Sequence, residues 1–464
     1  MTREEIIVEE INLFLRSKKR ETMLKGMRYY EGKHDILERK RTAIGEGGRV
    51  QEIQNIPNNR VIDNLYRKMI MQKANYLLGK PFSIQTDNEK YADLLNGAFS
   101  RRFFKTLNAI CIDSLNCGIG WAFVYYDSNG NISLRRLNPT EVVPIWKDEE
   151  HETLDFAIRF FDIDAYEGKE HRIMRVVEVF ESDGMSRYEL LNNELKPLQT
   201  GKENYISIDE TGYNWSRIPL IPFKANAEET ALIQHVKTLQ DALNMLLSDF
   251  VNNMQEDCRN TILVLENCGG EELGSFRKNL SEYGAIKVSG EMDSRASVKT
   301  LRIEVDNENY KVILDIMKRS LIENAMGYDA KDDRIGGNAN QMNIQSMYSD
   351  IELAANQMET EYQYSLESLV WFLDTHFANV RQGTFYDISV DFVFNRDMLM
   401  NETEIISNIR ASVGLLSRQT LVAQHPWVKD ADAEIKRLED EERAAAEADA
   451  DYQHEAHDAQ AGEK

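Results

Sequence analysis

The segment DDRIGGNANQMN, at positions 332–343, places two acids, a base and two adjacent glycines in one short polar stretch. A glycine-rich loop ahead of a helical pattern suggests phosphate binding, in which backbone amides hold the phosphates and a lysine reaches the outer ones. That motif needs Gly-x-x-x-x-Gly-Lys-Ser/Thr directly after a strand. No lysine follows Gly336 or Gly337, and no strand-like pattern precedes them, so we do not predict nucleotide binding here.

Two other short segments match metal-binding motifs only in part. His454 and His457 are three residues apart, whereas a zinc-protease helix needs two histidines four residues apart beside a glutamate. In DSNGNIS, residues 127–133, the glycine is at the fourth position, although a calcium loop needs it at the sixth. We interpret the first segment as part of a solvated acidic tail and the second as a hairpin turn.

No set of residues indicates an enzyme. The sequence has no Gly-x-Ser-x-Gly motif, and neither Cys111 nor Cys258 lies in a context that predicts a paired base. The carboxylates that could assemble the magnesium site of a nuclease are Asp162, Asp164, Glu178 and Glu181. Among 78 acidic residues, however, proximity by chance is the simpler interpretation. We therefore predict no enzymatic activity, no cofactor and no metal, and keep a metal-dependent nuclease as an alternative.

The composition narrows the class of protein. The chain has 464 residues, of which 42% are hydrophobic, and a formal net charge of −23. Such acidity disfavours a protein that clamps nucleic acid through many phosphate contacts, because that mode needs clustered Lys and Arg. The four cysteines fit neither a zinc ligand pair nor a disulfide framework, which favours a reducing compartment. Nowhere do 18 apolar residues run together, so we predict no membrane span.

The first 224 residues predict an α+β region. Residues 59–79 have a helical pattern with Asn59 as a possible N-cap and a stop at Gly79 and Pro81. In residues 121–137, two alternating apolar runs flank an Asn-Gly step, which is typical of a β-hairpin. Further strand-like stretches are residues 154–161, 171–182 and 186–191. Prolines at 219 and 222 indicate a boundary after which a helix can begin.

Three long helical patterns follow, at about residues 227–258, 307–326 and 341–380. Strand-like stretches lie between the first two, and an alternating strand-like stretch follows the third. An apolar stripe along an isolated rod must be buried, and contact with copies of the same chain around a closed ring would bury it. The residues predicted to pack between subunits are Leu232, Val236, Leu239, Leu243, Leu246, Phe250, Ile313, Met317 and Leu321.

Several of these stretches resemble the portal proteins of tailed double-stranded DNA bacteriophages, in particular the siphophage type. The resemblance lies in YYEGKHDILERK, in NNRVIDNLYRKMIMQKANYLLGKPF and in GLLSRQTLVAQHPWVKDADAEIKRLEDEE, with helix, small insert, helix, loop and long helix between them. It implies an α+β, mainly α portal fold with long helices. The implied regions are a wing (1–224 with strand 380–395), stem helices (225–258 and 306–328), a clip (259–305), a tunnel loop (329–343), a long helix to the wing (344–379), a crown (396–445) and an acidic disordered tail (446–464).

The resemblance also implies a function. Portal proteins form a ring, commonly of twelve subunits, at one capsid vertex, through which DNA enters during packaging and leaves during ejection. The implied partners are the large terminase, which supplies ATP hydrolysis, a head-completion adaptor, and the major capsid and scaffolding proteins. The chain would be located in the virion, and in the host cytoplasm during assembly.

In this interpretation the loop contacts double-stranded DNA weakly and without sequence specificity. We expect two basic side chains to make transient phosphate contacts, two acids to offset them, two asparagines to add neutral hydrogen bonds, and two glycines to supply mobility. These residues are Lys331, Arg334, Asp332, Asp333, Asn338, Asn340, Gly336 and Gly337. The alternative from a different class is an intracellular helical scaffold or adaptor that never contacts DNA.

Overall fold

The computed structural model describes residues 1–44, 49–52, 57–167, 170–208, 211–256, 261–266, 297–302, 307–329, 341–396, 402–428, 431 and 434–444. The chain divides into two compact units, each built from two segments. The first unit is Met1–Gly327 with Leu353–Arg396, and the second is Tyr328–Glu352 with Asp397–Lys464. The structure is 51% helical and 22% strand, and all the described strand pairs are antiparallel, which is consistent with the predicted α+β class.

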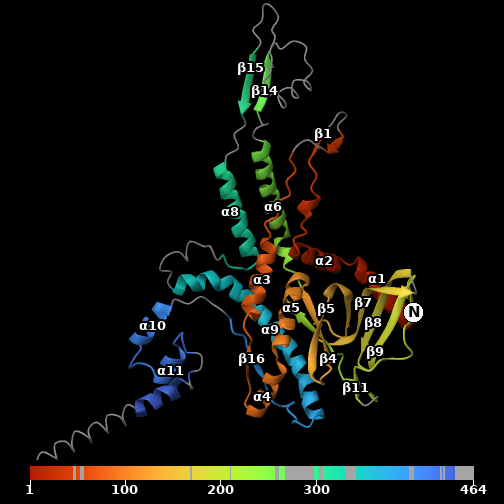
Figure 1. Ribbon diagram of the computed structural model, residues 1–464, viewed down its shortest axis with the longest axis vertical. Coiled ribbons are helices and arrows are strands. Elements are labelled where there is room, and N and C mark those ends of the chain that lie inside the picture. Colours follow the sequence, from red (N-terminus) through yellow and green to blue (C-terminus); the bar gives the residue numbers. More distant parts are fainter. Residues whose placement is uncertain are drawn as a thin grey trace, which may run out of the picture. The chain divides into compact units, whose positions relative to one another are not determined.

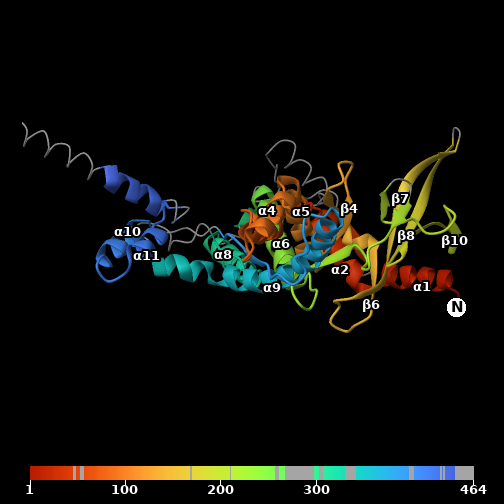
Figure 2. The ribbon, with the colours of Figure 1, turned by 90° about the horizontal axis from the view of Figure 1, so that it is seen from below.

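The first unit begins with two amphipathic helices, α1 (Arg3–Arg16) and α2 (Lys18–Tyr30). A capping box starts α1, since the Thr2 hydroxyl accepts the Glu5 amide and the Glu5 carboxylate accepts the Thr2 amide. Ile7, Ile11 and Phe14 recur at helical spacing and are buried. Figure 2 shows α1 running beside strands of the largest sheet, against which this apolar face packs.

That sheet has five antiparallel strands in the order β10-β9-β8-β7-β6. The strands are β6 (Val142–Trp146), β7 (Leu154–Glu167), β8 (Glu170–Glu181), β9 (Gly184–Leu191) and β10 (Glu194–Pro197). The three strands predicted between residues 154 and 191 are therefore confirmed. Residues 162–167 of β7 and 170–175 of β8 pair only with each other among the described residues, because the register with β6 ends at Arg159 and the register with β9 ends at Val176.

A second sheet has the order β13-β4-β5, from β4 (Ile119–Tyr126), β5 (Ile132–Leu137) and β13 (Leu220–Lys224). The predicted hairpin is confirmed: Gly130 has φ 78°, and the Asp127 carboxylate accepts the amides of Asn129 and Asn131 at 2.9 and 3.0 Å. The boundary predicted at Pro219 and Pro222 contains the edge strand β13, and a helix begins after it at Ile233. Proline fits in β13 because, among the described strands, β13 pairs with β4 alone, so a missing amide can face away from the sheet.

The helical part of this unit contains α3 (Leu65–Leu78), α4 (Glu89–Ala98), α5 (Arg101–Cys117) and the later part of α9 (Gln341–Asn379). Its core holds large side chains from all four, including Tyr66, Tyr91, Leu107 and Tyr362. The long third rod is confirmed, since α9 spans 39 residues.

The strand predicted around residues 380–395 forms only over β16 (Asp391–Val393), which pairs with β3 (Ser83–Gln85). The alternating apolar pattern before it has another cause. Phe385 is buried and stacks on Tyr91 with ring centroids 4.4 Å apart, so it fills the core without joining a ladder.

Two helices, α6 (Ile233–Glu256) and α8 (Asn307–Asn324), pack side by side (Figure 1). The strands β14 (Thr261–Glu266) and β15 (Ser297–Arg302) form an antiparallel pair between them in sequence. The first rod was predicted from residue 227, but α6 begins at Ile233. The preceding residues form a turn, in which the Asn226 side chain accepts the Thr230 amide at 2.8 Å and Glu229 has φ 53°.

Shorter elements complete the described chain. They are the 3-10 helices η1 (Asp35–Glu38) and η3 (Pro139–Glu141), and the strands β1 (Thr42–Ile44), β2 (Val50–Glu52), β11 (Ile206–Ile208) and β12 (Thr211–Tyr213). The second unit contains the first turns of α9, α10 (Glu402–Ala411) and α11 (Arg418–Ala423). Within the described residues, every helix is too short or too polar to cross a bilayer.

Candidate subunit-packing surface and channel

The nine apolar residues predicted to pack between subunits do not share one environment. Leu232, Val236, Leu243 and Leu321 are buried in the chain's own core, with at most 8% of each side chain exposed. Their apolar character is therefore accounted for without a neighbouring chain, and we do not retain the subunit-packing role predicted for them. Partly buried members of the set are Leu239, Leu246, Phe250 and Met317.

The ninth residue, Ile313, belongs to an exposed apolar row on α8. Val312, Ile313 and Ile316 are 56%, 46% and 57% exposed, and their spacing places them on one side of the helix. On α6, Met245 and Met254 are 42% and 62% exposed. The sequence analysis did not identify Val312, Ile316 and Met245 because it followed one stripe per helix, although the i, i+4 pair of Val312 and Ile316 signalled a second face.

The inner face of α6 carries a polar ladder made of Gln240, Asn244, Ser248 and Asn252, all with no exposed area. Each side chain accepts a hydrogen bond from a backbone amide in residues 59–66. The acceptor–donor pairs are Asn252 with Asn59 at 2.7 Å, Ser248 with Val61 at 2.9 Å, Asn244 with Asp63 at 3.1 Å, and Gln240 with Tyr66 at 3.0 Å.

The ladder works because two backbone repeats nearly coincide. Four residues of α-helix rise about 6.0 Å, and two residues of extended chain span about 6.6 Å. Every fourth side chain of α6 therefore meets every second amide of an extended segment. The amides at Asn59, Val61 and Asp63 consequently have side-chain acceptors in place of a secondary-structure partner.

This arrangement corrects the predicted start of α3. Asn59 was the expected N-cap, but it lies in the extended segment, and α3 begins at Leu65 behind Asn64. The Asn64 side chain accepts the Arg67 amide at 2.9 Å. The helix starts later because the ladder satisfies the preceding amides outside a helix.

A buried histidine completes the ladder. His34 is 1% exposed, its Nδ1 lies 2.8 Å from Asn244 Nδ2, and its Nε2 lies 3.1 Å from the Tyr29 carbonyl oxygen. Burial lowers the pKa of His34. A neutral ring that donates from Nε2 and accepts at Nδ1 fits both contacts. Tyr29 and His34 are therefore both packed in the interior of the first unit.

At the base of α6, Glu229 joins three basic groups. Its carboxylate pairs with Lys19, lies 2.7 Å from His151 Nδ1, and lies 3.8 Å from Lys224 Nζ. The Glu229 side chain is 5% exposed. Burial raises the pKa of this carboxyl, but Lys19 and His151 outweigh burial and hold the pKa below its usual value. This cluster connects α2 and the β6–β7 turn to the segment that leads into α6.

The four carboxylates considered for a magnesium site are each paired with a basic side chain. The pairs are Asp162–Arg175 at 2.7 Å, Asp164–His171 at 2.8 Å, Glu178–Arg159 at 3.2 Å and Glu181–Arg3 at 2.8 Å. Among the described residues, no three His, Cys, Asp or Glu side chains gather as metal ligands would. Asp162–Arg175 and Glu178–Arg159 are opposite-charge pairs across β7 and β8, and the contacts of all four carboxylates give them a structural explanation.

The thiol considered as a nucleophile is also buried. Cys111 and Cys117 are at most 2% exposed, and burial raises the pKa of Cys111 to about 12. A thiol with so high a pKa is almost entirely protonated at neutral pH, which makes it a poor nucleophile. Cys258 lies outside the described residues.

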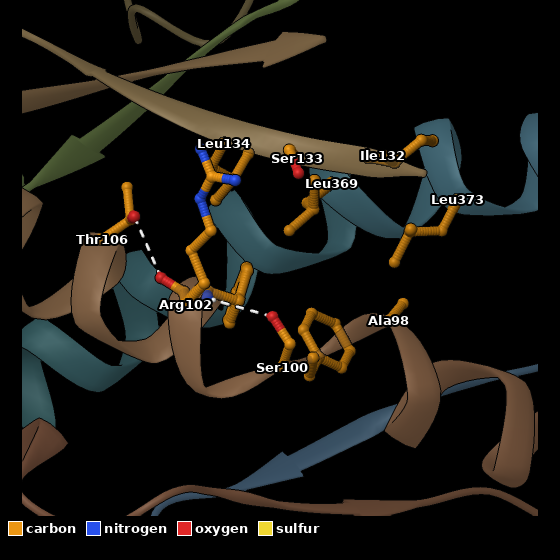
Figure 3. A pocket seen from close by; sticks show the side chains of 11 residues that line it. Ala98, Ser100, Arg102, Thr106, Ile132, Ser133, Leu134, Leu369 and Leu373 are labelled. Atoms are coloured by element: carbon orange, nitrogen blue, oxygen red, sulfur yellow. Dashed lines mark hydrogen bonds between the residues drawn. The ribbon is translucent and has the colours of Figure 1, made fainter. Parts of the chain in front are cut away.

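A small cavity lies between α5, β5 and α9 (Figure 3). Its volume is about 30 Å³, and its lining includes Phe99, Phe103, Leu369 and Leu373 together with the polar Arg102. Such a volume holds one or two water molecules and no organic cofactor.

The predicted channel loop lies outside the described residues, with all eight residues assigned to it, Lys331, Asp332, Asp333, Arg334, Gly336, Gly337, Asn338 and Asn340. The same holds for the tail at 446–464 and for most of residues 259–305. The described chain flanks the loop with Met326 at φ 49° after α8, and with Gln341 at the start of α9.

The sequence model described as "Phage portal protein, SPP1 Gp6-like" matches residues 16–448. The chain belongs to this family. It is 27% identical over 434 residues to a portal protein of Bacillus phage SPP1, which covers 92% of the chain and 85% of that protein. It is 25% identical over 456 residues to a portal protein of Clostridium phage phiCD119, which covers 94% of the chain and 96% of that protein. The resemblance found in the sequence is therefore confirmed at the level of the portal family.

Proposed function

We propose that this chain is the subunit of a portal ring at one capsid vertex, through which DNA enters and leaves the capsid. The match to the portal family over residues 16–448 carries this proposal. The proposed regions are those predicted from the sequence: a wing, two stem helices, a clip, a tunnel loop and a crown. In the described chain, the stem corresponds to α6 and α8, the described part of the clip to β14 and β15, and the crown to the stretch that includes α10 and α11.

Ring closure would use the exposed row on α8 and not the buried stripe. Val312, Ile313 and Ile316 form an apolar surface that a neighbouring copy can cover. A heterologous contact of this kind generates a closed ring when its rotation closes, and it leaves an opening on the axis. We propose that α6, on which Met245 and Met254 are exposed, supplies the apolar counterpart, and twelve is the proposed number of subunits.

DNA contact at the tunnel loop remains a proposal based on residue type. Lys331 and Arg334 would contact phosphates transiently, and the neighbouring Asp332 and Asp333 would keep that attraction shallow. Binding of this kind is weak and depends strongly on salt.

The proposed partners follow from the regions. The clip would bind the large terminase during packaging and a head-completion adaptor afterwards, and the wing would contact the major capsid and scaffolding proteins. The terminase, and not this chain, would hydrolyse ATP. The ring would be located in the virion, after assembly in the host cytoplasm.

The experiment that tests the proposal combines native mass spectrometry and negative-stain images of the full chain. We expect a closed oligomer whose mass is a multiple of 53.6 kDa, with a central pore. The double variant Ile313→Asp with Ile316→Asp should dissociate it, because charges placed in an apolar contact are costly to desolvate. The matched control is Leu13→Asp with Leu24→Asp, which places two charges at exposed positions of α1 and α2.

Stable monomers or filaments without a pore would contradict the ring and would favour the intracellular scaffold or adaptor. If the variant Ile313→Asp with Ile316→Asp still forms the ring, the proposed portal function stands, but the proposed contact through α8 is refuted.

A further inference from the structure

A basic groove lies on the first unit, between α5 and the β4–β5 hairpin. Its volume is about 400 Å³, and the residues that line it are Arg102, Lys105, Thr106, Ala109, Tyr125, Leu134, Arg135 and Arg136. Four of these eight residues are basic and none is acidic, in a chain whose net charge is −23. Arg102, Thr106 and Leu134 also line the small cavity of Figure 3, where Arg102 extends toward β5.

Three of the four basic groups carry free charge. Arg136 is neutralised by Asp113, which accepts both Nε and a terminal nitrogen of its guanidinium. Within the described residues, Arg102, Lys105 and Arg135 form no ion pair, and each is exposed. Arg102 and Lys105 are also three residues apart on α5, where like charges repel each other. The repulsion between these like charges disfavours the arrangement in the isolated chain, and an external anion would relieve it.

Tyr125 positions two of the three cations. A terminal nitrogen of Arg102 donates to the Tyr125 hydroxyl at 3.2 Å, and the Arg135 guanidinium lies 4.9 Å from the centre of the Tyr125 ring. Phe123 extends the support for Arg135, with its ring centre 5.9 Å away. Holding a guanidinium by its face or by one nitrogen leaves its other N–H groups available for a phosphate.

The surroundings favour a phosphate backbone over a protein partner. Protein interfaces derive most of their affinity from buried aromatic or aliphatic anchors. Among the described residues, none of the large apolar side chains that are mainly exposed lies on α5, β4 or β5. Two of the three free cations are arginines, whose planar fork matches phosphate oxygens in pairs.

We propose that Arg102, Lys105 and Arg135 form a binding site for the phosphate backbone of duplex DNA, separate from the tunnel loop. The positive groove is independent of the portal assignment, but the choice of DNA as its polyanion rests on the proposed function. The site would add a contact between the wing and DNA that has no sequence specificity, because phosphates carry no sequence information directly.

The test is the salt dependence of binding of the full chain to a labelled 12-base-pair duplex, roughly 40 Å long, measured by fluorescence anisotropy. Two variants are compared. The reference variant carries Lys331→Gln and Arg334→Gln, which removes the contacts proposed for the loop. The groove variant carries these two changes together with Arg102→Gln, Lys105→Gln and Arg135→Gln. The slope of log K against log salt is negative. Each lost phosphate contact reduces its magnitude by about 0.9, so the loss of three contacts reduces it by about 2.7.

A difference of this size is large enough to measure. Between 50 and 200 mM salt, affinity for the duplex should fall about 40-fold more with the groove intact than without it, by the same relation. Tyr125→Phe, which keeps the ring but loses the hydroxyl that holds Arg102, should give an intermediate slope. The matched control replaces Arg16, Lys147 and Lys196 by glutamine, for the same change in net charge on other elements, and should leave the slope unchanged.

An unchanged slope in the groove variant, or an equal decrease in the control, would overturn the proposal. Loss of binding to a labelled glutamate 12-mer without any change in DNA binding would also overturn it, and would assign the groove to an acidic protein segment. Native mass spectrometry of the same samples separates the two proposals. A ring with an unchanged slope refutes the groove alone, whereas absence of a ring refutes the portal function whatever the slope.

Discussion

Replacement of Asn244 by alanine would remove the side chain at the centre of the polar ladder. Asn244 Oδ1 accepts the amide of Asp63 at 3.1 Å, and its Nδ2 lies 2.8 Å from His34 Nδ1. The alanine variant leaves the partly buried Asp63 amide and the buried His34 Nδ1 without these partners. An unsatisfied buried group costs about 1–3 kcal/mol. We therefore expect local destabilisation of about 1–3 kcal/mol at Asp63, and more for the ladder as a whole.

Amide hydrogen exchange measures this cost residue by residue, which matters because a chain with two units need not unfold in one step. A loss of 1–3 kcal/mol at Asp63 should accelerate exchange of its amide roughly 5- to 150-fold. The Val61 amide, which Ser248 accepts, should change less. Asn324→Ala, at an exposed position of α8, is the control and should leave these amides unaffected. Unchanged exchange at Asp63 in Asn244→Ala would refute the idea that the ladder holds the extended segment.

Two further substitutions test buried charge. Arg136→Leu should lower the local free energy of opening at α5 and β5 by roughly 2–4 kcal/mol, measured by amide hydrogen exchange. The loss is smaller than for a fully buried pair because Arg136 is 47% exposed, and adding Asp113→Leu should recover part of it. The pKa of the Glu229 carboxyl is held below its usual value of about 4.5. Its pairing with Lys19 and His151 should therefore stabilise the chain fully above pH 4.5, and this stabilisation should be lost as the pH falls through the lowered pKa. The stability difference between the unmodified chain and Glu229→Gln should therefore shrink below pH 4.5, and a difference constant from pH 7 to 3 would contradict this.

The elements that sequence reasoning predicted well are those with strong periodicity. The hairpin at residues 121–137 combines an apolar alternation with an Asn-Gly turn, and the strands between 154 and 191 and the 39-residue α9 each have a sustained apolar repeat. Apolar periodicity did not show which part of the molecule covers an apolar helix face. It identified the stripe through Val236 and Leu243 as buried, but it could not tell the chain's own core from a neighbouring subunit.

The polar ladder was missed for a related reason. Gln240, Asn244, Ser248 and Asn252 recur every four residues, but a polar repeat on a helix usually faces solvent. The docked segment at residues 59–66 covers these side chains together with His34, and the segment contributes backbone amides, which every residue other than proline carries. The type of a distant residue gives no information about such a partner. The basic groove was missed in the same manner, since Arg102 and Arg135 come together only through packing of α5 on β5.

The spacing of the ladder also determines how α6 can move lengthwise. Because the acceptors repeat every fourth position, a translation by less than one repeat would separate several amides from their acceptors at once. A translation by a whole repeat of about 6 Å would again place an acceptor opposite most of the same amides. Axial travel of this helix is therefore stepwise, with stops whose separation is fixed by backbone geometry.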